Sequence, residues 1–113
     1  MAETTKHLYE GMYVLNAIIS EDLRNKTFEK IKEGITSRGG AIHKIHDQGK
    51  RSLAYEVNSQ KEGYYYLVYF DATPDAMKDM WREYRLNEYL LRFLTLRADT
   101  VMDELKFKKL PEQ

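Results

Sequence analysis

Two strand-like runs separated by a polar turn constrain this chain more than any other part of its sequence. In the first run, Leu53, Tyr55 and Val57 stand at every second position, which places them on one face of an extended chain. The segment 58–63 is polar and ends in glycine, so we expect the chain to reverse direction there. The run 64–70 is an unbroken series of aromatic and branched residues, which favours a strand. Because two paired strands are not stable alone, the rest of the chain must supply neighbouring strands and covering helices.

Two helices are predicted from their N-terminal caps and from apolar residues at helical spacing. Ser20 is a suitable cap for the first helix, and Gly39 and Gly40 end it. Thr73 caps the second helix, and Pro74 stands in its first turn. The apolar residues that mark one side of each helix are Leu23, Phe28, Ile31 and Ile35 in the first, and Met77, Met80, Trp81 and Tyr84 in the second. We therefore expect each helix to bury one face.

The order of the strands and helices defines a fold class. Strands are predicted at 7–15, from 41 through a bend near Gly49 to 57, at 64–70 and at 90–97. With right-handed crossovers, this order gives an α+β fold of the ferredoxin-like split βαβ type, a βαββαβ sandwich. Such a fold has a four-stranded antiparallel sheet with two helices on one face. The opposite face must then be polar or meet a partner.

Length and composition indicate one domain. We expect an N-terminal extension at 1–6, the ferredoxin-like domain at 7–97 and a C-terminal tail at 98–113. Residues 1–6 lack the apolar core of a signal peptide, and the longest apolar run is far shorter than the roughly 18 residues of a membrane span. The chain has no cysteine, which excludes disulfides, thiolate metal sites and cysteine nucleophiles.

The sequence offers no set of residues that indicates catalysis or metal binding. His43 and His46 fall on opposite faces of a strand, and neither a cysteine nor a third nearby histidine completes a metal site. An acylphosphatase-like enzyme on this fold would need a glycine-bounded phosphate cradle with an arginine after the first strand, and residues 16–20 supply none. We therefore expect no enzymatic activity, no cofactor, no metal and no small-molecule substrate.

A free single-stranded RNA-binding module is the alternative that the strand sequences leave open. Lysine and arginine together number 18, as do aspartate and glutamate, so the net charge does not itself indicate a nucleic-acid binder. The segments 12–17 (MYVLNA) and 63–69 (GYYYLVY) resemble the short and long motifs of RNA-recognition domains, although Tyr65 stands where that family has glycine or alanine. In such a domain, aromatic side chains on the open sheet face would stack on bases.

A second resemblance covers nearly the whole domain, from Leu8 to Arg97. The segments that carry it are Tyr9-Glu10, Gly39-Gly40, Gly49-Lys50-Arg51, Leu53-Ala54-Tyr55, Glu62-Gly63-Tyr64-Tyr65, Leu86-Asn87-Glu88 and Leu91-Arg92. In this order they resemble the family of bacterial small-subunit ribosomal protein six. Members of that family have the split βαβ fold and no catalytic activity, so the resemblance agrees with the fold predicted from the residues.

The resemblance also implies a function and a location. It implies a structural constituent of the small ribosomal subunit, which binds the central domain of the small-subunit ribosomal RNA together with ribosomal protein eighteen, its heterodimer partner. The expected location is cytoplasmic and ribosome-bound, away from any membrane. We predict RNA contacts at Lys6, Arg51, Arg85, Arg92 and Arg97. We predict contacts with the protein partner at Tyr55, Tyr64 and Tyr66.

Overall fold

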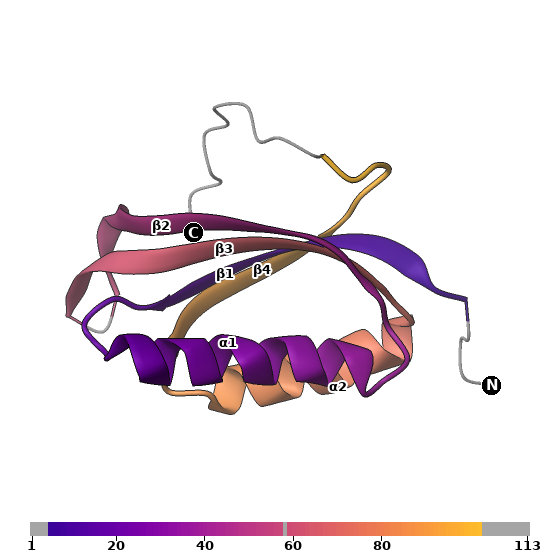
Figure 1. The fold of residues 1–113 in the computed structure, drawn as a ribbon, viewed down its shortest axis with the longest axis horizontal. Coiled ribbons are helices and arrows are strands. Elements are labelled where there is room, and N and C mark those ends of the chain that lie inside the picture. Colours follow the sequence, from indigo (N-terminus) through magenta and orange to yellow (C-terminus); the bar gives the residue numbers. More distant parts are fainter. Residues whose placement is uncertain (1–4, 58, 103–113) are drawn as a thin grey trace.

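Six elements of secondary structure follow one another in the predicted order. The computed structural model describes residues 5–57 and 59–102. Its elements are β1 (His7–Asn16), α1 (Glu21–Thr36), β2 (Ile42–Val57), β3 (Gln60–Ala72), α2 (Pro74–Leu86) and β4 (Leu90–Arg97). The strand order in the sheet is β2-β3-β1-β4, and every neighbouring pair is antiparallel. Figure 1 shows α1 and α2 together on one face of the sheet, which confirms the predicted fold.

The central strand β1 contributes side chains to two separate apolar clusters. Tyr9, Tyr13 and Leu15 belong to the larger one, between the sheet and the helices. Met12 and Val14 belong to a smaller cluster on the opposite face. Successive side chains of a strand point to opposite faces, so the period of two in this segment fills both clusters. Both faces of β1 therefore contribute to buried clusters, as befits a strand with neighbours on both sides in the sheet.

The predicted caps begin both helices. The hydroxyl oxygen of Ser20 accepts a hydrogen bond from the backbone N–H of Leu23 at 3.2 Å. In the same way, Oγ1 of Thr73 accepts from the backbone N–H of Ala76 at 3.2 Å, with Pro74 in the first turn. Each cap satisfies one of the backbone donors that a helix leaves unpaired at its start, which typically stabilises a helix by about 1 kcal/mol.

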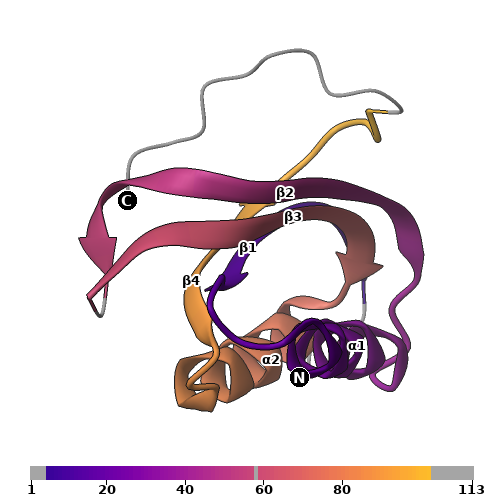
Figure 2. The ribbon, with the colours of Figure 1, turned by 60° about the vertical axis from the view of Figure 1, so that its left-hand side comes forward.

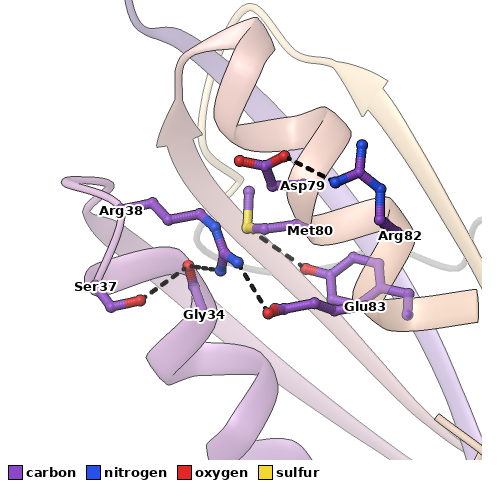
Figure 3. Close-up of polar contacts among 8 residues, drawn as sticks. Gly34, Ser37, Arg38, Asp79, Met80, Arg82 and Glu83 are labelled. Carbon is purple, nitrogen blue, oxygen red and sulfur yellow. Dashed lines mark hydrogen bonds and ion pairs between the residues drawn. The ribbon is translucent and has the colours of Figure 1, made fainter. Parts of the chain in front are cut away.

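A single arginine links the end of α1 to the outer surface of α2. Arg38 donates from Nη1 to the carbonyl oxygen of Gly34 at 2.9 Å and from Nη2 to Oε2 of Glu83 at 2.9 Å. Figure 3 shows the guanidinium lying between the two helices. The bond to Glu83 raises the pKa of Arg38, so this side chain stays charged. Because the pair is largely exposed, its contribution to stability is small, about 1 kcal/mol or less.

The β2–β3 hairpin turns within a shorter segment than its polar residues predicted. β2 runs to Val57 and β3 begins at Gln60, so Gly63 lies inside β3 and not in the turn. The pairing of the two strands shifts register between Asp47 and Gly49, where Gly49 has a φ of 75°. This irregularity confirms the predicted bend, since glycine adopts a positive φ without steric cost. Figure 2 shows that β2 and β3 run side by side and curve together.

Gly63 is required by the close approach of a neighbouring strand. A Cβ atom at this position would collide with Cγ1 of Val14, and it would lie 3.4 Å from Cδ2 of Leu53. The sequence assigned this glycine to the chain reversal, and that assignment was wrong. Its small size lets the side chains of Val14 and Leu53 pack over the hairpin backbone.

The face of the sheet opposite the helices is apolar and is covered in part by the chain itself. We call its buried residues the open-face cluster: Met12, Val14, Tyr65, Leu67 and Tyr69. The residues that pack against this cluster are Leu53, Leu94, Ala98, Val101 and Met102. The segment after β4 therefore covers a face that the prediction left to polar residues or a partner. Nε2 of His46 lies 2.7 Å from the carbonyl oxygen of Met102 and holds this segment at the sheet. Of the predicted extension and tail, residues 1–4 and 103–113 lie outside the described part of the chain.

Candidate nucleic-acid interface

Arg92 and Tyr55 meet although they lie on the two opposite edge strands of the sheet. Nη2 of Arg92 on β4 donates a hydrogen bond to the hydroxyl of Tyr55 on β2 at 2.7 Å. The guanidinium carbon lies 4.8 Å from the centroid of the Tyr55 ring, within the range of a cation–π interaction. The Tyr55 side chain remains 48% exposed. The sequence assigned Arg92 to RNA and Tyr55 to a protein partner, and the structure places both in one surface site.

The pleat of the strands explains why these side chains share a face. Arg92 is the cross-strand partner of Val14, a member of the open-face cluster, and such partners point to the same side of a sheet. Arg51 pairs with Gly63, whose Cβ would meet Val14, so Arg51 lies on this face too, and it is exposed. The β2–β3 pairing shifts register between Ser52 and Val57, and it is the contact with Arg92 that places Tyr55 on this face. We call Arg51, Tyr55 and Arg92 the hairpin-end surface.

Arg85 lies beside this surface, at the end of α2. Together with Arg92 it lines a shallow depression of about 460 Å³ at the turn between α2 and β4. The other residues that line it are Tyr84, Asn87, Glu88, Leu90, Leu91 and Phe93. The depression is wide open, so it suits a surface ligand and not an enclosed substrate.

Lys6 and Arg97 lie toward the other end of the sheet. Arg97 pairs with Tyr9 on β1, whereas Arg92 pairs with Val14. Five residues of extended strand separate these two partners, which corresponds to roughly 16 Å. Lys6 immediately precedes β1 and therefore lies near Arg97. The five predicted RNA-binding residues thus form two groups, three at the hairpin end and two at the opposite end.

Tyr64 and Tyr66 point toward the helices and not toward the hairpin-end surface. The Tyr66 ring stacks on Phe28 of α1, with centroids 3.8 Å apart, and only 5% of Tyr66 is exposed. The Tyr64 hydroxyl donates to Oδ2 of Asp47 at 3.2 Å, and Tyr64 is half-buried. Burial raises the pKa of both hydroxyls, so both are neutral at pH 7. Tyr55 is therefore the only one of the three predicted partner-binding tyrosines that presents a largely exposed ring.

Arg24 is a residue that the sequence analysis did not select. Its guanidinium carbon lies 3.9 Å from the centroid of the Tyr64 ring, and its Nε is buried without a hydrogen-bond partner among the described residues. Helical spacing could have identified it, because Arg24 lies four residues before Phe28 and so shares the face that meets the sheet. It connects α1 to the Tyr64 ring of β3.

Apart from the half-buried Tyr64, the aromatic residues of the two RNA-recognition-like segments are buried. Tyr13 is fully buried on the helix side, where its hydroxyl lies 3.0 Å from that of Tyr84. Tyr65 is on the opposite face but belongs to the buried open-face cluster. Base stacking requires exposed rings on an open sheet face. The structure therefore disfavours the free RNA-recognition module that these segments suggested.

The histidines have structural partners. Nε2 of His43 lies 3.0 Å from Oδ2 of Asp71, and His46 contacts the Met102 backbone as described above. Within residues 5–57 and 59–102, no group of three or more histidine, aspartate or glutamate side chains could hold a metal ion. In the same part of the chain, every helix is too short or too polar to cross a bilayer.

The chain is a ferredoxin-like βαββαβ sandwich, with Arg85 and Arg92 beside a shallow, open depression at one end of its sheet. The model of the family described as "Ribosomal protein S6" matches residues 8–97. The chain belongs to the ribosomal protein S6 family. It is a structural protein of the small ribosomal subunit and not an enzyme.

Several relatives resemble the chain over its whole length. It is 54% identical over 113 residues to the small ribosomal subunit protein bS6 of Protochlamydia amoebophila, covering 100% of this chain and 99% of that protein. It is 52% identical over 112 residues to the bS6 protein of Chlamydia pneumoniae, covering 99% and 100% of the two chains. The crystal structure of 30S ribosomal protein S6 from Thermotoga maritima superposes with a TM-score of 0.78 at 28% identity, over 83% of this chain and 89% of that one.

Proposed function

We propose that this protein binds the central domain of the small-subunit ribosomal RNA together with ribosomal protein eighteen, as a heterodimer in the cytoplasmic ribosome. Membership of the ribosomal protein S6 family supports this proposal. The single observation that carries the RNA contact is the placement of Arg85 and Arg92 around one open depression, with Arg51 on the same end of the sheet.

The chemistry of these residues suits a phosphate backbone. A guanidinium offers several N–H donors in a planar fork, which matches two oxygens of one phosphate. Among the described residues, Tyr55 is the only hydrogen-bond acceptor of the Arg92 guanidinium, and no carboxylate forms an ion pair with it. We propose that this guanidinium binds an RNA phosphate. Lys6 and Arg97 make a second group of phosphate contacts at the other end of the sheet.

The partner contact is proposed for the tyrosines in order of exposure. Tyr55 offers a ring at the surface, and Tyr64 offers a half-buried one. Tyr66 can act only through its neighbours, because its ring is stacked beneath α1.

Binding of a central-domain RNA fragment, in the presence of ribosomal protein eighteen, tests the RNA contact. We expect Arg92→Ala to weaken binding and to reduce the salt dependence by about one phosphate contact, a slope change of roughly 0.7–0.9 in log K against log salt. Arg82→Ala is the matched control, because Arg82 is an exposed arginine on α2 that pairs with Asp79. Equal affinities and equal slopes for both variants would remove Arg92 from the interface.

A further inference from the structure

The hydrogen bond between Arg92 and Tyr55 connects the two edges of the sheet across its open face. β2 and β4 are separated in the sheet by β3 and β1. The contact is possible because the end of the β2–β3 hairpin lies over the open-face cluster. Leu53 packs against that cluster, and Gly63 leaves room for Leu53 and Val14. Tyr55, two residues after Leu53, is thereby held above Arg92.

We propose that Tyr55 is a positioning residue that holds the Arg92 guanidinium ready for an RNA phosphate. This inference rests on the proposed function, and it assigns Tyr55 to the RNA surface in place of the partner contact. The ring lies against the guanidinium and the hydroxyl accepts one of its N–H groups. The remaining N–H donors of the guanidinium are left to take a phosphodiester in bidentate fashion.

A tyrosine suits this role better than a carboxylate would. An aspartate or glutamate beside Arg92 would orient the guanidinium but would also neutralise its charge, which would weaken its attraction for phosphate. A phenol hydroxyl accepts a hydrogen bond while remaining neutral. Tyr55 therefore orders the long, flexible Arg92 side chain before RNA binds. The free energy of RNA binding then does not include the entropy cost of ordering that side chain.

The position of Tyr55 agrees with this role in a second way. Tyr55 is 48% exposed and Arg92 is half-buried, so the pair lies at the surface of the sheet. Arg51 pairs with Gly63 on the open face, so this face carries a second exposed cation on β2. The β2 strand thus contributes the cation Arg51 and the side chain of Tyr55, which orients Arg92 on β4.

A double-mutant cycle on RNA binding tests the inference. The full chain and its variants Tyr55→Phe, Tyr55→Ala, Arg92→Ala and Tyr55→Ala/Arg92→Ala are titrated with a central-domain RNA fragment in the presence of ribosomal protein eighteen, at several salt concentrations. Ala54→Ser, an exposed substitution on the same hairpin, is the control. Thermal unfolding of each variant shows whether it is folded. If Tyr55→Ala does not fold, Tyr55→Phe still tests the hydrogen bond, because it keeps the ring.

We expect Tyr55→Ala to weaken binding about three- to tenfold and to lower the salt slope toward that of Arg92→Ala. Tyr55→Phe keeps the ring contact and loses the 2.7 Å hydrogen bond, so its affinity should lie between those of the wild type and Tyr55→Ala. In the Arg92→Ala background, Tyr55→Ala should not weaken RNA binding further, because the guanidinium that Tyr55 orients is absent.

Three results would overturn the inference, and they separate it from the proposed function. If Arg92→Ala weakens binding while both Tyr55 variants match the wild type, Arg92 contacts RNA without help from Tyr55. If Tyr55→Ala weakens binding equally with and without Arg92, Tyr55 makes its own contact with RNA or with the partner. If Arg92→Ala has no effect, the proposed phosphate contact fails, and the role of Tyr55 fails with it.

Discussion

The Arg92 guanidinium on β4 lies against the Tyr55 ring on β2, and the 2.7 Å hydrogen bond between them joins strands that are not neighbours in the sheet. The contact depends on the curvature of the hairpin and not on the pairing of β4. It brings together two residues that the sequence assigned to different partners. The hairpin end is therefore a single surface in which the arginine proposed to bind RNA and an aromatic side chain are in direct contact.

The first prediction concerns the free protein. Tyr55→Phe should lower the free energy of unfolding by less than about 1 kcal/mol, because the lost hydrogen bond is at the surface, where water replaces it. Urea unfolding at pH 7 measures this change. A loss of several kcal/mol would mean that the bond holds the hairpin in place, and the effect of Tyr55 on RNA binding would then be indirect.

The second prediction compares Gly63 with Gly34, at which an added methyl group should have opposite effects on stability. Gly63→Ala should destabilise the protein by roughly 1–3 kcal/mol, because its Cβ collides with Cγ1 of Val14 in a packed cluster. Gly34→Ala is the matched control. It lies within α1, and its Cβ would meet only the ends of two flexible side chains, that of Arg38 at 3.4 Å and that of Glu83 at 3.6 Å.

Gly34→Ala should therefore stabilise the protein by up to about 1 kcal/mol, since alanine favours a helix interior over glycine. Thermal or urea unfolding of the two variants gives opposite signs if this account is right. Equal losses in both would mean that the α1 position is also crowded. A neutral Gly63→Ala would show that Val14 and Leu53 can move aside.

The sequence predicted the fold because each element carried its own local signal. Ser20 and Thr73 capped the helices where expected, and the strand from Leu90 to Arg97 has the predicted bounds. These features depend on a few neighbouring residues, and so they can be derived without knowledge of the rest of the chain.

Which face of the sheet a side chain occupies could not be derived in the same way. The alternation in β3 places Tyr64 and Tyr66 on one side and Tyr65 on the other, but both sides are apolar. The position of α1 decides which side faces the helices, because Phe28 of α1 stacks on Tyr66. The Arg92–Tyr55 contact could not be predicted from the sequence for a related reason, since it depends on how far the hairpin curves over the sheet. The role of Gly63 likewise depends on the position of Val14, a strand away.

The third prediction concerns the segment that follows β4. Val101 packs against the open-face cluster, so Val101→Asp should place a charge on buried apolar surface and destabilise the protein by roughly 1–3 kcal/mol. Thr100→Asp is the control, because Thr100 is exposed and should tolerate the same charge within about 0.5 kcal/mol. Urea unfolding measures both. Similar stabilities for the two variants would indicate that residues 98–102 leave the sheet readily and expose the cluster.

The fourth prediction concerns stability at alkaline pH and follows from a buried pair of tyrosines. The hydroxyls of Tyr13 and Tyr84 lie 3.0 Å apart in the core. Burial raises the pKa of Tyr84 from 10.0 to about 12, and burial together with the neighbouring Tyr84 raises the pKa of Tyr13 well above its usual value. Above pH 10 the unfolded chain loses these protons while the folded chain keeps them. Since the unfolded state then binds fewer protons, the free energy of unfolding falls as the pH rises.

The share that belongs to Tyr84 can be isolated by substitution. A shift of one pKa unit corresponds to about 1.4 kcal/mol, so Tyr84 should contribute a loss of roughly 2–3 kcal/mol by pH 12. Tyr84→Phe cannot ionise, so it should cost about 1 kcal/mol at pH 7 through the lost hydrogen bond and then lose less stability than the wild type between pH 9 and 11.5. Urea unfolding across this range measures both slopes. Parallel curves would show that the alkaline loss arises elsewhere, and that water reaches the Tyr84 hydroxyl before the core unfolds.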